Sequence, residues 1–239
     1  MKTALDLIEL LPWTDWAALA AYLADWAGYV LFARLRGHQR PSVLATTNAI
    51  RRQWMLQATH REVRVVDGVV IQNLSSSPSF FASTTILIIG GLLAVLGTTE
   101  RASELVREIP FAAHTSVLVF DLKIVLLLMI YVYAFFRFTW SMRQYTFGAL
   151  MVAAAPEAET LDAQGAEGEA WRQAFADRAG RVVGLAAETF NDGLRAYYFA
   201  FAAIGWFFSP ILFMLATAVV VYILYQREFR SEVLGVLRS

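Results

Sequence analysis

Residues 73–97, NLSSSPSFFASTTILIIGGLLAVLG, carry the clearest structural signal in this chain. From Ser79 to Gly97 no side chain is charged, a run of 19 residues. An α-helix rises about 1.5 Å per residue, so about 20 apolar residues cross the hydrocarbon core of a bilayer. The run therefore predicts a membrane-spanning helix, which we place at residues 79–98.

Small side chains recur along one face of this predicted helix. Small residues let the backbone of a second helix come close. At spacings of three, four or seven residues, the members of this small-residue face are Ser79, Ser83, Gly90, Ala94 and Gly97. The other face, which includes Ile86 and Leu93, suits lipid or a packed neighbour.

The chain as a whole is more apolar than a soluble domain. Hydrophobic residues make up 58% of its 239 residues, whereas soluble domains contain about 45–50%. The excess gathers in four runs, so we expect an all-α fold, a polytopic membrane helix bundle in a single domain. It would have about four transmembrane helices together with amphipathic cytoplasmic helices. The spans are placed at about residues 13–33, 79–98, 116–138 and 198–226.

Three of these spans contain residues that are unusual inside a membrane. Asp25 lies well within the first span, and a charged carboxylate at mid-membrane costs about 2.5–3.5 kcal/mol on insertion scales. Asp121 and Lys123 lie in the third span. On a helix they point about 200° apart, so they cannot both face one neighbour. Pro210 lies in the fourth span and either kinks it or breaks it into two helices.

Two long polar connectors, 34–72 and 139–197, separate the spans. In the first, residues 42–57 have the apolar spacing of a helix, which lies either at the membrane surface or against the rest of the protein. In the second, residues 153–170 are small and acidic, and we expect a mobile loop there. The connector 99–115 has opposite charges at helical spacing and predicts a short solvated helix.

Positive charge is unevenly distributed among these segments. The connectors 34–72 and 139–197 hold 12 Arg, and the segments assigned to the other side hold six Lys or Arg. Cytoplasmic loops are enriched in positive charge, so we place both connectors in the cytoplasm and both termini on the opposite side. Arg outnumbers Lys by 18 to 2, which is typical of GC-rich bacteria, and we expect the bacterial cytoplasmic (inner) membrane. The acidic start, with Asp6 and Glu9, is unlike a signal peptide, and we expect it to stay on the mature protein.

The composition argues against several kinds of chemistry. Cysteine is absent, which excludes disulfides and thiolate ligands. The three histidines stand far apart without a metal-binding spacing, and no metal or other cofactor is predicted. Net charge is zero and no nucleic-acid-binding motif occurs, so nucleic acid is not an expected partner. The serines at 75–77 lack the context of a catalytic serine, and an enzyme is left open but not favoured.

Four separated strings resemble the DUF599 family of bacterial and plant integral membrane proteins. In chain order they are NLSSSPSFFASTTILIIGGLLAVLG, YAFFRFTWSMRQY, NDGLRAYYFAFAAIGWF and LYQREFRSE. The resemblance covers most of the chain apart from the acidic stretch near 152–170. It implies a membrane location, but it implies neither an activity nor a catalytic residue, because the family has no established function.

Two groups of polar residues are candidate sites. A polar path inside the membrane would consist of Asp25, Ser83, Thr84, Asp121 and Lys123. A cluster at the cytoplasmic boundary would consist of Asn73, Arg137, Arg143, Asn191 and Arg195.

These residues leave two functions open. Ionisable groups inside a membrane usually face a bundle interior or water, which favours a channel or transporter for an ion or small solute. Four spans are few for a pore, so this function requires a homo-oligomer in the lipid bilayer. The alternative is an accessory or scaffolding protein that assembles with itself or with a protein partner. In that case the intramembrane charges pair with one another rather than line water.

Overall fold

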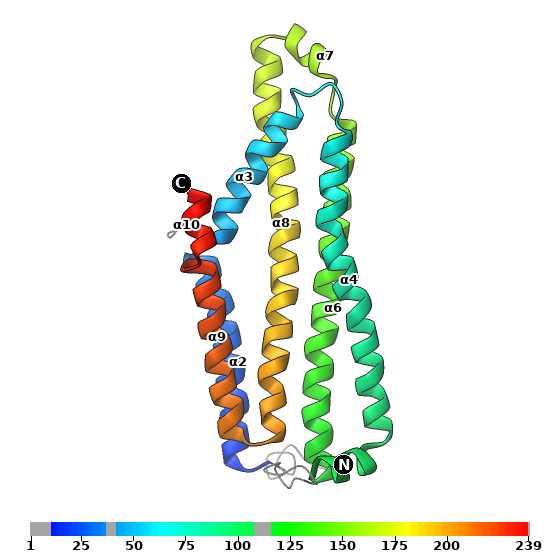
Figure 1. Cartoon of the computed structure of the whole chain (residues 1–239), viewed down its shortest axis with the longest axis vertical. Helices are drawn as coiled ribbons and strands as arrows, with labels where there is room; N and C mark the ends of the chain where they lie inside the picture. The colour runs from blue at the N-terminus through cyan, green and yellow to red at the C-terminus, as the bar shows by residue number, and fades with distance from the viewer. Residues whose placement is uncertain (1–10, 37–41, 108–115, 239) are drawn as a thin grey trace, which may run out of the picture. The chain divides into compact units, whose positions relative to one another are not determined.

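The computed structural model describes residues 11–36, 42–107 and 116–238. These residues are almost entirely helical, with no strand among them, which confirms the predicted all-α class. Figure 1 shows the helices α2 Trp13–Arg36, α3 Val43–Ala58, α4 Val65–Gly97, α5 Thr99–Arg107, α6 Val117–Ala154, α7 Ala158–Ala163, α8 Ala166–Ile204, α9 Pro210–Phe229 and α10 Glu232–Arg238.

Four helical segments are long and apolar enough to cross a membrane, judged by length and composition. They are Trp13–Ala33, Val65–Gly97, Val117–Ala154 and Pro210–Arg238. The chain is therefore a multi-pass membrane protein. Both α4 and α6 are longer than the spans expected at 79–98 and 116–138, because a helix continues past the end of its apolar run wherever polar residues still favour helical backbone.

The predicted span 198–226 consists of two helices rather than one. α8 ends at Ile204, a short 3-10 turn η1 follows at Gly205–Phe207, and α9 begins at Pro210. Proline suits the first turn of a helix, where its missing N–H needs no partner. The Ser209 hydroxyl accepts a hydrogen bond of 3.0 Å from the Leu212 N–H and so caps α9. The chain therefore breaks here, and α9 turns back beside the end of α8 (Figure 1).

The chain divides into two compact units. Unit 1 contains residues 1–39, 85–134 and 194–227, and unit 2 contains residues 40–84, 135–193 and 228–239. Unit 1 is held by an aromatic core in which the Tyr22 ring contacts Phe199 of α8 and Phe213 of α9, at 5.6 and 4.8 Å between centroids. The Tyr22 hydroxyl also donates to the Phe199 carbonyl at 3.1 Å. Tyr22 thus joins α2 to both arms of the α8–α9 hairpin.

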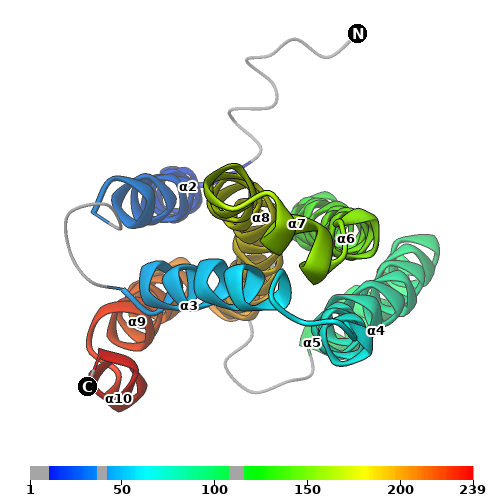
Figure 2. The same ribbon diagram turned by 90° about the horizontal axis from the view of Figure 1, so that it is seen from above.

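Unit 2 is built around the crossing of α3 and α8. The predicted helix at 42–57 is confirmed as α3, and it packs against this protein: Met55 is buried in one core with Tyr145, Phe175 and Val183. Figures 1 and 2 show α3 running obliquely to α8. A Cβ on Gly180 would lie only 2.8 Å from the Arg52 Cα, so the approach of the two backbones requires glycine.

The acidic stretch 153–170 is ordered, and the mobile loop expected there was wrong. It contains α7, whose Leu161 is buried at 1% exposure. Arg172 of α8 donates to Asp162 at 2.9 Å and to the Ala158 carbonyl at 3.0 Å. A guanidinium on the following helix therefore supplies the order that the small local side chains lack.

The C-terminal helix α10 lies beside α3, the helix of the first long connector. α10 packs against α3, as Figure 1 also shows, and Glu228 accepts a hydrogen bond of 3.1 Å from the Leu44 N–H at the start of α3. This contact argues against the expectation that the C-terminus faces away from connector 34–72. The break before Pro210 adds one reversal of the chain and so brings the C-terminal helix back to α3.

Candidate functional site

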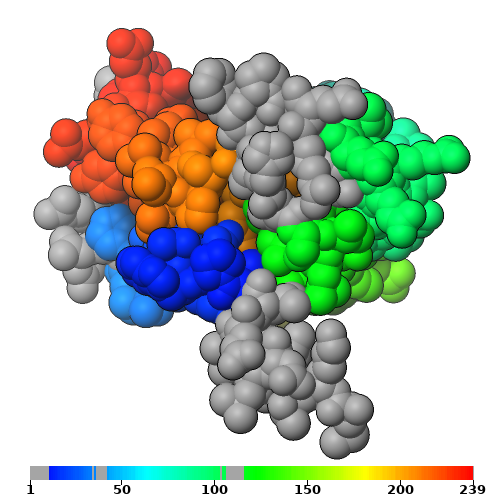
Figure 3. Space-filling view, turned by 90° about the horizontal axis from the view of Figure 1, so that it is seen from below, coloured from blue at the N-terminus to red at the C-terminus, as the bar shows by residue number. Residues whose placement is uncertain are grey.

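Trp206 organises the polar interior of unit 1. Its carbonyl accepts a hydrogen bond of 2.8 Å from the Lys123 ammonium, which is only 2% exposed. Its indole N–H donates to the buried Asp15 carboxylate at 2.6 Å, and Asp15 also acts electrostatically on Lys123. The Lys123 Nζ lies 5.4 Å from the centroid of the Trp206 ring, a cation–π distance. Figure 3 shows the first turn of α2, in blue, next to the region where α8 ends and α9 begins, in orange.

Asp121 and Lys123 contact different partners, as their spacing predicted. Asp121 accepts a hydrogen bond of 2.8 Å from the Thr99 hydroxyl at the start of α5. Thr85 of α4 is fully buried, and its hydroxyl shares a 2.8 Å hydrogen bond with the Tyr197 hydroxyl of α8. These polar groups of unit 1 are thus engaged in contacts between helices.

Asp25 differs from these residues because it is exposed. Its side chain forms no hydrogen bond or ion pair with any residue in the part of the chain that the structure describes. It lines a groove of about 460 Å³ between α2 and α9, together with the aromatic residues Tyr29, Phe32, Tyr222 and Tyr225. Neither Asp121 nor Lys123 lines this groove.

Ser83 and Thr84 belong to unit 2. Ser83 is exposed, and the Thr84 hydroxyl donates to the Phe80 carbonyl of its own helix at 2.9 Å. Thr84, Asp121 and Lys123 therefore have separate partners, and within unit 1 Asp25 lines a groove apart from Asp121 and Lys123.

The expected boundary cluster yields one ion pair. Arg137 of α6 pairs with Asp192 of α8, which the sequence analysis did not single out. Asn73 and Arg143 are exposed, and their side chains form no hydrogen bond or ion pair with other described residues. Asn191 is half-buried beside Asp192 in sequence. Arg195 is buried in unit 1, with its guanidinium 5.6 Å from the centroid of the Tyr29 ring.

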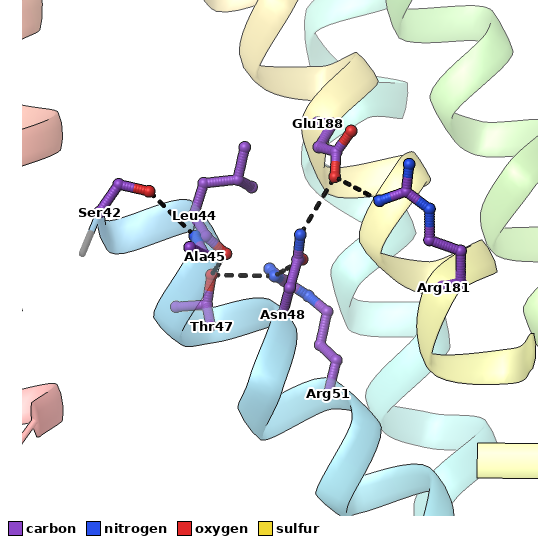
Figure 4. Close-up of polar contacts among 8 residues, drawn as sticks. All are labelled: Ser42, Leu44, Ala45, Thr47, Asn48, Arg51, Arg181 and Glu188. Carbon is purple, nitrogen blue, oxygen red and sulfur yellow. Dashed lines mark hydrogen bonds and ion pairs between the residues drawn. The ribbon is translucent and has the colours of Figure 1, made fainter. Parts of the chain in front are cut away.

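The crossing of α3 and α8 holds a polar network that sequence reasoning missed. The Asn48 amide donates to the Glu188 carboxylate at 3.1 Å, and Arg181 pairs with the same carboxylate at 3.2 Å (Figure 4). Arg51 donates to the Asn48 side-chain oxygen at 2.8 Å, and its pKa is lowered mainly by burial. The sequence signal that could have revealed this crossing is the pair Gly180 and Gly184, four residues apart on one face of α8.

A surface ion pair flanks this network. Arg52 of α3 pairs with Asp177 of α8, and the hydrogen bond from Arg52 lowers the pKa of the Asp177 carboxyl. Both side chains are more than 45% exposed, so the pair contributes little to stability. These groups line a second groove of about 260 Å³, but their charges are already paired with each other.

Four of the five residues of the small-residue face of α4 lie exposed, and the fifth, Ser79, is half-buried. Ser83, Gly90, Ala94 and Gly97 are all exposed, and a Cβ added at Gly90 or Gly97 would meet nothing within 4 Å. The buried side chains of this helix, such as Thr85, lie on its other side. The face that suits close helix packing is therefore uncovered in a single chain.

Metal binding has no support among the residues that the structure describes. No group of three His, Asp or Glu side chains gathers there in a way that could hold a metal ion.

Comparison with known proteins gives one match. A family model described as "Protein of unknown function, DUF599" matches residues 17–233, nearly the whole chain. This confirms the resemblance that the four strings carry. No curated protein and no solved structure matches the chain.

Proposed function

Because this chain belongs to the DUF599 family, whose description assigns no function, we propose a role from its geometry: an accessory membrane protein that assembles with itself through α4. The bacterial cytoplasmic membrane is the location that we propose, on the strength of the Arg-rich composition and the positive connectors.

The observation that carries this proposal is the uncovered small-residue face. Gly90, Ala94 and Gly97 are exposed, and the two glycines have open space around them. In lipid, helices associate through close packing of small residues rather than through hydrophobic burial. A second α4 fits this requirement, because an isologous contact places the same small face on both sides.

The interior charges support assembly over conduction. Lys123, Asp15 and Asp121 each hold a partner within unit 1. A charge that is hydrogen-bonded within its own bundle is compensated there, and it leaves no row of free polar groups to replace the hydration shell of an ion.

The proposal is tested with one pair of matched variants. Gly90→Leu places a large side chain in the middle of the small-residue face. Gly91→Leu places the same side chain about 100° around the helix, also into open space. Sedimentation in mild detergent should give an oligomer for the wild type and for Gly91→Leu, and a monomer for Gly90→Leu. A wild-type chain that sediments only as a monomer would overturn the proposal.

The contacts of α8 and α10 support a topology with five membrane-embedded segments. The end of α8 packs with Tyr22 of α2 and turns back through η1 into α9. α10 lies against α3. With connector 34–72 in the cytoplasm, the N-terminus then faces out and the C-terminus faces in.

Transport is the second candidate function, and Asp25 is the observation that favours it. This carboxylate lines a groove and has no partner among the described residues. Flux of ions or small solutes into liposomes, compared between the wild type and Asp25→Asn, tests this function. Flux equal to that of empty liposomes would remove it.

A further inference from the structure

Asp25 lies near the middle of α2 and has no hydrogen-bond or ion-pair partner among the residues that the structure describes. It is 12 residues from Trp13 and 11 from Arg36, the two ends of α2, which corresponds to about 18 Å and about 16 Å along the helix. Lipid headgroups therefore lie far from this carboxylate if α2 crosses the membrane. Lys123, Asp15 and Asp121 all have partners within unit 1, whereas Asp25 has none in the described ranges.

The groove around Asp25 has the composition of an organic-cation site. One wall comes from α2 and includes Tyr29 and Phe32, and the other comes from α9 and includes Tyr222 and Tyr225. The faces of aromatic rings carry negative potential and attract cations, most strongly where water is excluded. The Tyr29 ring already faces the Arg195 guanidinium at 5.6 Å. A carboxylate beside the three other rings therefore selects positive charge and rejects anions.

The size and donor set of the groove narrow the ligand further. A volume of about 460 Å³ lies in the range of sites for small organic molecules. Gly28, on the same wall as Asp25, leaves open space where a side chain would otherwise stand. A metal ion would need several oxygen or nitrogen ligands, and no such group is present among the described residues. An organic cation with a shielded charge needs one counter-ion and an apolar wall.

We propose that the groove between α2 and α9 binds a lipophilic organic cation, with Asp25 as its counter-ion and the rings of Phe32, Tyr222 and Tyr225 as its wall. The ligand class is a hydrophobic monocation, such as a quaternary ammonium, a phosphonium or a protonated amine. This binding site does not depend on self-assembly through α4, nor on whether the bound cation is transported.

Equilibrium binding to the purified full chain in lipid nanodiscs tests the site. The probes are radiolabelled tetraphenylphosphonium and tetraphenylborate, which match in size and hydrophobicity but carry opposite charges. Saturable binding of the cation is expected, with little binding of the anion. Asp25→Asn should weaken binding of the cation at least tenfold. The matched control Asp121→Asn changes the same group in the same unit but outside the groove, and it should bind like the wild type.

A second variant keeps the test decisive if Asp25→Asn folds poorly. Gly28→Leu fills the groove and leaves the carboxylate in place, so it should abolish binding of tetraphenylphosphonium. The inference is overturned if the wild type does not bind the cation, if it binds both probes equally, or if Gly28→Leu binds like the wild type. The first result would point to a cationic side chain of another helix, or to a proton, as the group that neutralises Asp25. Gly90→Leu should retain binding, which separates this result from the test of self-assembly.

Discussion

Trp206 is the residue on which the polar interior of unit 1 most depends. It uses its carbonyl for Lys123 and its indole N–H for Asp15, and its ring stacks on Phe213 at 5.3 Å. A buried carboxylate and a buried ammonium are both costly without such partners. One side chain thus supports two charged groups that come from different helices.

Trp206→Phe should destabilise the protein while keeping most of the aromatic packing. The variant keeps the carbonyl that binds Lys123 but removes the donor to Asp15, and an unsatisfied buried acceptor costs about 1–3 kcal/mol. The apparent midpoint of thermal denaturation in detergent, taken at a fixed scan rate, should therefore fall. The control is Trp171→Phe, because the Trp171 indole N–H donates to no described residue and its ring stacks on Phe175. An equal loss of stability in both variants would contradict the assigned role of the Trp206 N–H.

Single residues also show the reach of sequence reasoning at this scale. Asp25, Asp121 and Lys123 stood out because charge is rare inside apolar runs. Asp15 was overlooked because it lies in the first turn of its helix, where an acidic residue has an ordinary explanation in the helix dipole. Its role becomes visible only when Trp206, 191 residues away, is placed beside it.

At the scale of elements, the crossing of α3 and α8 depends on glycine. The polar network of Asn48, Arg51 and Glu188 can form only because α3 approaches α8 closely at Gly180. The two helices are joined by charge-assisted hydrogen bonds that lie outside the candidate membrane-spanning segments. Water there limits what these bonds contribute to stability. Close packing therefore carries much of this contact.

Gly180→Ala should weaken the crossing. The new Cβ would meet the Arg52 backbone at 2.8 Å, and backbone cannot rotate away, so overpacking should cost about 1–3 kcal/mol. Gly68→Ala is the matched control, because Gly68 lies in a helix of the same unit with nothing within 4 Å. There alanine should be neutral or stabilising by up to about 1 kcal/mol, since it is the better helix former. Faster hydrogen exchange of α3 amides in Gly180→Ala alone would support this account, and equal exchange in both variants would refute it.

Arg64 shows how one side chain closes the ends of two helices. It donates to the Ala58 carbonyl at 3.0 Å and to the Ala155 carbonyl at 2.6 Å, and also to the Pro156 carbonyl. Carbonyls at helix C-termini have no partner within the helix. The arginine-rich connector, read from sequence as a signal of membrane orientation, therefore also has a structural task.

At the scale of the whole molecule, the side on which each segment lies is open to direct measurement. The chain has no cysteine, so single cysteines can be introduced without a background of native thiols. Suitable positions are exposed and lie on three different helices: Gln53 on α3, Glu104 on α5 and Gly235 on α10.

A membrane-impermeant maleimide applied to intact cells should separate these positions. Gln53→Cys and Gly235→Cys should be protected together, because α10 packs against α3 and we place both in the cytoplasm. Glu104→Cys should be labelled, because α4 lies between α3 and α5 in the chain and crosses the membrane in the proposed topology. Different labelling of Gln53→Cys and Gly235→Cys would contradict the contact between α10 and α3.

Sequence alone determined the membrane class, the helical fold and the family, because apolar run length, helical spacing and residue strings are local properties. It also identified charges that fall inside apolar runs, such as Asp25, Asp121 and Lys123. Tertiary structure decided which of those charges are compensated, because the partners are carbonyls and indole N–H groups from distant segments, as with Lys123 and Trp206, 83 residues apart. It likewise decided the break before Pro210 and the contact of α10 with α3, because a reversal of the chain depends on a cap and on the packing of both arms against a third helix.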